Sequence, residues 1–245
     1  MTRHGAGERR ILEQVADRQV RRWTLEGEIS RRLALEPPPD ARPVPLSHYL
    51  RPYIALSREA GAGGGEIARL VAERLGWEVL DSELLELMAE RYHLPRHMLD
   101  VVDETRANWF HEMFAKWVDQ HAVTQAEYVV HLGKIVLLAA QHGKVVFVGR
   151  GTQFLLPADA GIAVRIVAPR DQRVRRLAEE RAVSPAEAER LIDEIDAGRV
   201  DFARRTFGKD PRDPHLYDLV VNLARVSRRD AADLIADLHP RRQAD

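Results

Sequence analysis

The feature that most constrains the fold is a glycine-rich stretch between an apolar run and a helical pattern. The apolar run begins at Tyr53 and stops at the polar pair Ser57-Arg58, and glycine fills four of the five positions 61–65. From Ile67 onward, apolar residues recur with the period of a helix. A strand, a glycine loop and a helix in this order direct backbone N–H groups at one point, which suits a phosphate. The sequence therefore predicts a phosphate-binding loop, although no lysine lies in or beside it.

The composition indicates a soluble globular protein with ample material for a core. Of the 245 residues, 45% are hydrophobic and 31% are charged, and the formal net charge of −1 gives no general reason to expect nucleic acid or a membrane as partner. Cysteine is absent, which excludes disulfides and thiolate metal sites. No window reaches the about 18 apolar residues of a membrane span, and no apolar segment follows the charged N-terminus, so we expect a cytoplasmic protein.

The first part of the chain predicts a helical extension followed by a linker. Apolar residues form a loose stripe over residues 8–35, among arginines that acidic residues interrupt. We therefore expect residues 1–36 to pack on the main domain or on a second copy of it, rather than on nucleic acid. Prolines forbid helix and strand ladders over residues 37–46, which predicts a stiff linker before a main domain at residues 47–240.

Short apolar runs alternate with helical patterns after the linker. The strongest is the run from Lys144 to Gly149, which is typical of a parallel strand covered on both faces. Strands are also expected from Tyr53 onward and over residues 77–80, 163–168 and 219–223. This alternation predicts an α/β fold with a five-stranded parallel sheet, right-handed crossovers and helices on both faces, plus the N-terminal helical extension.

Local signals mark the ends of several predicted helices. Gly76 and Gly143 are expected to end the helices before them, and residues 184–187 form a capping box with proline at the first helical position. A charged helix is expected from Asp171, and Ser227 is expected to cap a closing helix that runs to residue 238. These signals divide the second half of the chain into separate helices.

Aromatic residues gather in a helical stretch between residues 109 and 117. Such a cluster is more often core or dimer surface than a platform for stacking bases. A homodimer formed through this cluster or through the N-terminal helix is therefore an open alternative to a monomer. The histidines are scattered without metal-binding spacing, so no metal site is expected from them.

Polar motifs directly follow the ends of three predicted strands. They are the loop Ser57–Gly65, the pair Asp81-Ser82 and the triplet Gly149-Arg150-Gly151. Because ligands of parallel sheets bind at the carboxyl ends of the strands, we expect these motifs to share one site. Nothing local requires a large cation between two glycines, although Arg150 could form a structural salt bridge. Asp81-Ser82 could equally be a helix cap.

With these motifs, the chain resembles the P-loop nucleoside-monophosphate kinases, and among them the bacterial cytidylate kinase-like family. The resemblance covers about residues 52 to 238 and implies a three-layer P-loop NTPase-like fold. It also implies a helical insertion on the acceptor side, at about residues 82–142, and a helical lid at about residues 171–212. The residues that carry it are Ile54–Ala68, Leu80–Ser82, Val148–Gly151, the lid-like segment from Glu194 to Arg205, and the segment from Tyr217 to Ile235.

The resemblance implies transfer of the γ-phosphoryl group of ATP to CMP or dCMP with Mg²⁺. It assigns the donor phosphates to the loop residues Gly61, Ala62, Gly63, Gly64, Gly65 and Glu66, and the acceptor nucleotide to Asp81, Ser82 and Arg150. The candidate catalytic residues are Arg58, Arg173, Arg176, Arg199, Arg204 and Arg205. Plainer alternatives stay open, because the glycines could form only a tight turn and any one lid arginine could belong to a solvated helix face.

The loop departs from the Walker sequence G-x-x-x-x-G-K-[ST]. When that sequence is laid on Arg58–Gly65, the lysine becomes Gly64 and the hydroxyl residue becomes Gly65. Glu66 follows where the cytidylate kinases carry a threonine, and Gly151 stands where they carry an acid. Strand Val145–Val148 offers no carboxylate for a metal. Arg58, at the mouth of the loop, could supply part of the missing positive charge.

The sequence leaves two functions open. The first is a cytidylate kinase-like phosphotransferase, acting on CMP, dCMP or a related nucleotide. The second is a nucleotide- or phosphate-binding module with weak or no catalysis, which acts as a sensor or partner protein. A scaffold without a ligand would leave Gly149-Arg150-Gly151 and the arginine-rich lid segment unexplained.

Overall fold

The structure is a computed structural model that describes residues 9–23, 50–91 and 123–242. These residues form two compact units. The sheet unit contains residues 51–82 and 143–242, and the helical unit contains residues 9–23, 50, 83–91 and 123–142.

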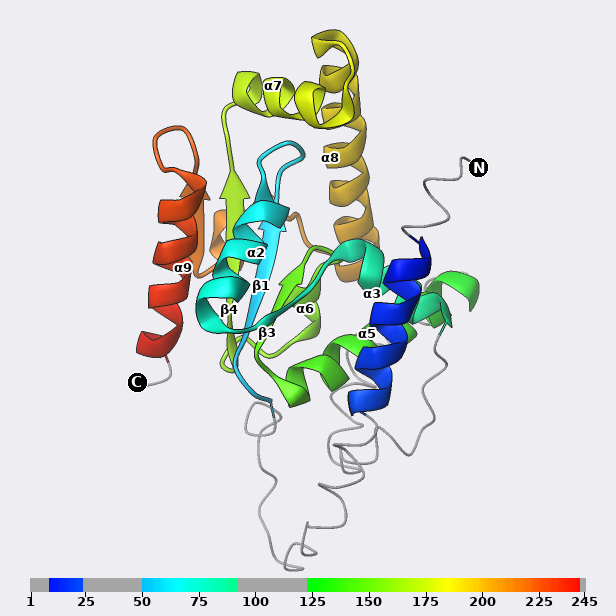
Figure 1. The fold of residues 1–245 in the computed structure, drawn as a ribbon. Coiled ribbons are helices and arrows are strands. Elements are labelled where there is room, and N and C mark those ends of the chain that lie inside the picture. Colours follow the sequence, from blue (N-terminus) through cyan, green and yellow to red (C-terminus); the bar gives the residue numbers. More distant parts are fainter. Residues whose placement is uncertain (1–8, 24–49, 92–122, 243–245) are drawn as a thin grey trace, which may run out of the picture. The chain divides into compact units, whose positions relative to one another are not determined.

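Five parallel strands form the sheet in the order β2-β3-β1-β4-β5 (Figure 1). β1 lies between β3 and β4, so that Ala55 stands opposite both Phe147 and Ala163. Because all the pairs are parallel, the loops that follow the strands emerge at one edge of the sheet. The predicted five-stranded parallel sheet is confirmed. The strands are β1 (Tyr53–Arg58), β2 (Glu78–Leu80), β3 (Val145–Val148), β4 (Gly161–Val167) and β5 (Leu219–Asn222).

Helices α2 (Gly64–Leu75) and α9 (Arg228–Arg242) lie side by side against one face of the sheet (Figure 1). Ile67 and Val71 of α2 and Ile235 of α9 are fully buried among apolar strand residues such as Leu56 and Val164. The helical spacing of the apolar residues in the sequence brings them to the same side of α2. The β1–α2 crossover is thereby held firmly on the sheet.

The predicted boundary signals are confirmed in the sheet unit. Gly76 ends α2 with a φ of 65°, and the Ser184 hydroxyl accepts the Glu187 N–H at 3.2 Å at the start of α8 (Pro185–Phe207). Ser227 accepts the Asp230 N–H at 3.0 Å, and α9 continues past residue 238 to Arg242. The short helix α6 (Thr152–Leu155) carries too few residues for a periodic signal and is absent from the sequence expectations. A 3₁₀ turn, η3, spans Pro214–Leu216.

Helices α7 (Arg170–Arg181) and α8 stand beyond the carboxyl ends of the strands (Figure 1). They share a small core of their own, made of Leu177, Ala188 and Ile192. Ala60 of the β1–α2 loop is buried in this same core. The loop is therefore packed directly on α7 and α8.

The helical unit contains a helix over residues 9–23, helix α5 (Val123–His142) and the part of α3 (Ser82–Arg91) that follows Ser82. The ring of Trp23 is 2% exposed and stacks on His142, with ring centroids 6.0 Å apart. None of the described helices is long and apolar enough to cross a lipid bilayer. The rest of the predicted N-terminal helix, the linker at residues 37–46 and the aromatic cluster at residues 109–117 lie outside the described residues.

Candidate functional site

The glycine loop turns from β1 into α2 through two residues with positive φ. Gly61 has a φ of 73° and Gly63 a φ of 82°, which glycine adopts without steric cost. Gly63 is also the N-cap of α2. A Cβ atom on Gly61 would lie 2.5 Å from the carbonyl oxygen of Arg173 on α7. Glycine at position 61 is therefore required both by the backbone conformation and by the close approach of α7.

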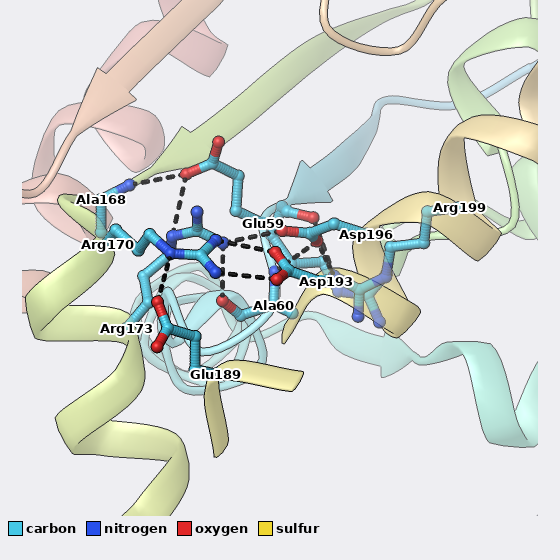
Figure 2. Close-up of polar contacts among 10 residues, drawn as sticks. Glu59, Ala60, Ala168, Arg170, Arg173, Glu189, Asp193, Asp196 and Arg199 are labelled. Atoms are coloured by element: carbon cyan, nitrogen blue, oxygen red, sulfur yellow. Dashed lines mark hydrogen bonds and ion pairs between the residues drawn. The ribbon is translucent and has the colours of Figure 1, made fainter. Parts of the chain in front are cut away.

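An ion-pair network ties the loop to both α7 and α8 (Figure 2). Asp196 of α8 accepts the Ala60 N–H at 2.8 Å and a hydrogen bond from Arg173 Nη1 at 2.7 Å. Arg173 Nε lies 3.5 Å from Glu59 Oε2, and this oxygen accepts the Ala168 N–H at 3.1 Å. Arg173, a candidate catalytic residue in the sequence, is only 8% exposed and anchors the loop to α7 and α8.

The side chain of Arg58 passes through space that two glycines leave open. A Cβ atom on Gly64 would lie 2.7 Å from the Arg58 Cβ, and one on Gly149 would lie 2.0 Å from Arg58 Nη1. The other end of the guanidinium, Nη2, donates a hydrogen bond to Ser82 Oγ at 3.2 Å. Arg58 thus occupies the volume from which a lysine at position 64 would extend, and brings its own charge to the same place.

A pocket of about 300 Å³ lies where β1 and β3 end, and we call it the β3-side pocket. Its lining includes Arg58, Arg150 and Arg199 together with Ser82 and Gln153. The structure therefore brings three of the predicted arginines together from three separate parts of the chain. Arginine binds phosphate oxygens through two parallel N–H bonds, so this lining suits a phosphate group.

Arg150 reaches the pocket from a strained turn. Gly149, Arg150 and Gly151 have φ values of 84°, 54° and 66° in succession. A non-glycine residue in the left-handed region is uncommon, and such strain is concentrated at functional sites. A Cβ atom on Gly151 would lie 2.3 Å from the ring of Phe207, and the Arg150 guanidinium carbon lies 5.9 Å from the Phe202 ring centroid. The turn fixes the direction of Arg150.

The charges around this pocket are predominantly positive. Burial, together with the neighbouring Arg199 and Arg150, lowers the pKa of Arg58 to about 9 against the opposing effect of Asp81 and Asp196, so Arg58 stays protonated at neutral pH. Burial also lowers the pKa of Arg199, whose Nη1 donates to the Arg58 carbonyl at 3.0 Å and lies 3.6 Å from Asp196 Oδ1. An anion in the pocket would relieve this mutual repulsion.

Arg165 of β4 belongs to the same group of charges and is absent from the sequence predictions. It is 8% exposed, donates to Ser57 Oγ at 3.2 Å, and its guanidinium lies 5.7 Å from the Tyr217 ring centroid. Within the described residues, no carboxylate lies within ion-pair distance of Arg58 or Arg165. The signal that could have revealed Arg165 is a charged residue in the middle of an otherwise apolar strand.

A second pocket, of about 450 Å³, lies beside the loop on the side of β4 and β5, and we call it the β5-side pocket. Its lining includes Gly61 and Ala62 of the loop. Glu66 Oε2 accepts hydrogen bonds here from Arg176 of α7 at 2.8 Å and lies 3.0 Å from Arg228 Nε of α9. We call this arrangement the Glu66 bridge. The hydrogen bond from Arg176, followed by that from Arg228, holds the pKa of Glu66 below its ordinary value.

Other predicted residues lie outside both pockets. Arg204 pairs with Asp210 at 2.8 Å and Arg205 with Asp201 at 2.8 Å, and both arginines are exposed on α8. Asp81 is exposed and precedes α3, whereas its neighbour Ser82 lines the β3-side pocket. Gly65 is exposed on the first turn of α2, with no atom within 4 Å of the place where its Cβ would stand. The structure thus separates the candidate residues into pocket-lining and peripheral groups.

The acidic residues near the loop are already engaged by hydrogen bonds. Glu59 and Asp196 accept backbone N–H groups and pair with Arg173, and Glu66 joins two arginines. Within the part of the chain that the structure describes, no group of three or more His, Asp or Glu residues could hold a metal ion.

Comparisons with known proteins agree with this geometry. The profile of the cytidylate kinase-like family matches residues 53–225. The cytidylate kinase of Pyrobaculum aerophilum is 27% identical over 188 residues, which cover 75% of this chain and 90% of that protein. The cytidylate kinase of Methanopyrus kandleri is 27% identical over 106 residues, which cover 40% of this chain and only 55% of that protein.

A solved structure from Eubacterium ventriosum, described as an uncharacterized protein, shares the fold. It superposes with a TM-score of 0.64 at 21% identity, and the match covers 78% of this chain and 99% of that one. The parallel sheet, the glycine loop after its central strand and the family match over most of the chain lead to one conclusion. The chain belongs to the cytidylate kinase-like family.

Proposed function

We propose that this protein transfers a phosphoryl group from ATP to CMP, dCMP or a related nucleoside monophosphate. The observation that carries the proposal is the convergence of Arg58, Arg150 and Arg199 on the β3-side pocket, next to the glycine loop. Phosphoryl transfer asks a protein mainly to position two phosphate-bearing substrates and to surround the transferred group with positive charge. The family and the two relatives named cytidylate kinase support this reaction.

The loop and the three arginines of the β3-side pocket have separate roles in this proposal. The backbone of the loop residues 61–65 holds the donor phosphates, and Arg150 holds the phosphate of the acceptor next to Ser82. Arg58 replaces the Walker lysine, because its guanidinium reaches past Gly64 into the β3-side pocket. Arg199 lies beside Arg58 and stabilises the negative charge of the phosphoryl group during its transfer.

Magnesium enters this proposal with the nucleotide. Mg²⁺ is usually held by substrate phosphates, water and one or two carboxylates, rather than by a cage of protein ligands. Since the carboxylates beside the loop are paired with arginines and backbone N–H groups, we assign none of them to the metal. The proposal also includes ATP as the donor, a cytoplasmic location and the domain limits expected from the sequence.

A panel of acceptors tests the proposal. Purified full-length protein with ATP and Mg²⁺ is incubated separately with CMP, dCMP, UMP and AMP, and ADP formation is measured. We expect turnover with CMP or dCMP above that with AMP. The absence of turnover with every acceptor would contradict the proposed reaction. The variant Arg150→Met is the control: it removes only the acceptor-side cation, so its ADP formation gives the background rate.

A second function is favoured by one specific observation. The loop lacks the Walker lysine, and the strand Val145–Val148 carries no carboxylate for a metal, so catalysis lacks two of its usual contributors. Each such positioned charge is worth about 3 kcal/mol in a transition state. A nucleotide-binding sensor would therefore bind CMP or ADP in calorimetry and form no product in the acceptor panel.

A further inference from the structure

The Glu66 bridge joins three helices at one carboxylate oxygen. Arg176 of α7 donates to Glu66 Oε2 at 2.8 Å, and Arg228 Nε of α9 lies 3.0 Å from the same atom. Glu66 itself stands in the first turn of α2. Two guanidinium groups from separate helices are thus brought together beside the glycine loop.

Both arginine side chains rest on the backbone of Gly63. A Cβ atom at Gly63 would lie 2.8 Å from the Arg176 guanidinium carbon and 3.0 Å from Arg228 Cδ. Any other residue at this position would push the two side chains away from the loop. Gly63 therefore serves a second purpose besides its positive φ, since it lets two cations approach the turn that lacks the Walker lysine.

Two carboxylates engage the guanidinium groups of the bridge. One carboxylate is shared between two guanidinium groups, and a second one, Glu180, pairs with Arg176 Nε at 2.7 Å within α7. Arg228 is about half exposed and faces the β5-side pocket, which Gly61 of the loop also lines. A phosphate in this pocket would meet both guanidinium groups with their forks already directed by Glu66.

We propose that Arg228 binds the donor phosphates together with Arg176, and that Glu66 is a positioning residue that holds both guanidinium groups at the loop. This inference rests on the proposed function, because it takes the β5-side pocket as the donor side. It gives Glu66 a use at the position where cytidylate kinases carry a threonine. The Glu66 carboxylate alone would repel a triphosphate. Because it holds two guanidinium groups beside the loop, its net effect is to place positive charge where the triphosphate binds.

The first experiment measures ADP binding by calorimetry in the absence of an acceptor. Arg228→Met keeps most of the side-chain volume and removes the charge, so the Kd for ADP is expected to rise about tenfold. Arg225→Met is the matched control, because Arg225 is exposed in the same segment and lines neither pocket. The Kd for CMP, measured on the same proteins, is expected to stay unchanged.

The second experiment separates positioning from charge at residue 66. Glu66→Asp keeps the negative charge but shortens the side chain by one methylene, so the carboxylate no longer reaches both guanidinium groups. We expect the Kd for ADP to rise about fivefold. A purely electrostatic role would leave it unchanged, and this result would overturn the positioning role of Glu66.

The outcomes distinguish the inference from the proposed function. If the unmodified protein binds ADP and Arg228→Met binds it equally well, the inference is wrong and the proposed function stands. If the unmodified protein binds CMP but no ADP, both the donor-side assignment and the phosphotransferase are wrong. Melting curves of each variant confirm that it is folded, and a loss of stability without any change in the Kd for ADP would assign the bridge a structural role only.

Discussion

The two pockets beside the glycine loop differ in how their arginines are balanced. In the β3-side pocket, Arg58 and the adjacent Arg165 have no carboxylate at ion-pair distance within the described residues. In the β5-side pocket, Arg176 and Arg228 share Glu66. An unbalanced buried charge costs stability until an anion arrives, whereas a paired charge is stable but must share its partner with the ligand.

This difference indicates how the two sides work. The β3-side pocket is prepared for an anion, because binding removes the repulsion among its arginines. The β5-side pocket keeps its cations in place by a carboxylate that competes with the incoming phosphate. The loop between the two pockets is held by Arg173, which forms ion pairs with Glu59 and Asp196 (Figure 2).

Removal of Arg173 should disturb both pockets together. Arg173→Met leaves Glu59 without its cation and Asp196 with only the more distant Arg199, and we expect the free energy of unfolding to fall by about 3 kcal/mol. Arg170→Met is the control, since Arg170 also joins α7 to α8 through Asp193 but is exposed, and its loss should change stability little. Urea unfolding of both variants measures the difference, and equal effects would contradict the anchoring role of Arg173.

Removal of Arg58 should separate activity from stability. Arg58→Met is expected to lower turnover about 100-fold, because one positioned charge is lost from the transition state. The same change removes an unbalanced buried cation, so the free energy of unfolding should rise by about 1 kcal/mol, or about 2–4 °C in Tm. Arg176→Met removes an arginine that is paired with Glu66, so it should lower Tm instead. A fall in Tm for both variants would contradict the difference in charge pairing between the two pockets.

Restoration of the Walker lysine should fail while Arg58 is present. A Cβ on Gly64 would lie 2.7 Å from the Arg58 Cβ, so Gly64→Lys should lower the free energy of unfolding by about 2 kcal/mol. The double variant Gly64→Lys with Arg58→Ala should recover most of this loss. Gly65→Lys is the neighbouring control, because no atom stands within 4 Å of that site, and it should cost nothing. Equal costs at positions 64 and 65 would show that Arg58 does not fill the lysine's place.

The Glu66 bridge should depend on pH in the acidic range. Its arginines hold the pKa of Glu66 below the ordinary value of 4.5, so its contribution to stability is complete above that pH and is lost as the pH falls through the lowered value. The Tm of the unmodified protein should exceed that of Glu66→Gln at neutral pH, and the two should converge as the pH falls through the lowered pKa of Glu66. A difference that persists in acid would mean that the carboxylate charge is not what joins the helices.

Much of the fold follows from local sequence. The glycine pattern at residues 61–65, the apolar runs and the capping box at residues 184–187 depend on backbone conformation and hydrophobic periodicity, which neighbouring residues carry. The same reasoning placed Arg58 and Arg150 at strand ends, and both line the β3-side pocket. The short helix α6 was missed, because four residues hold too little periodicity.

Local sequence is enough to predict the five strands, their order along the chain and the loop that turns between the central strand and α2. Which arginines meet depends on the packing of distant elements. Asp196 reaches Ala60 across 136 residues, and Arg228 reaches Glu66 only because α9 packs beside α2. Nothing in the local sequence distinguishes Arg199, which lines a pocket, from Arg204 and Arg205, which face solvent on the same helix. Charge pairing depends on distances between separate elements, and those distances are set by the packing of the helices on the sheet and on the loop.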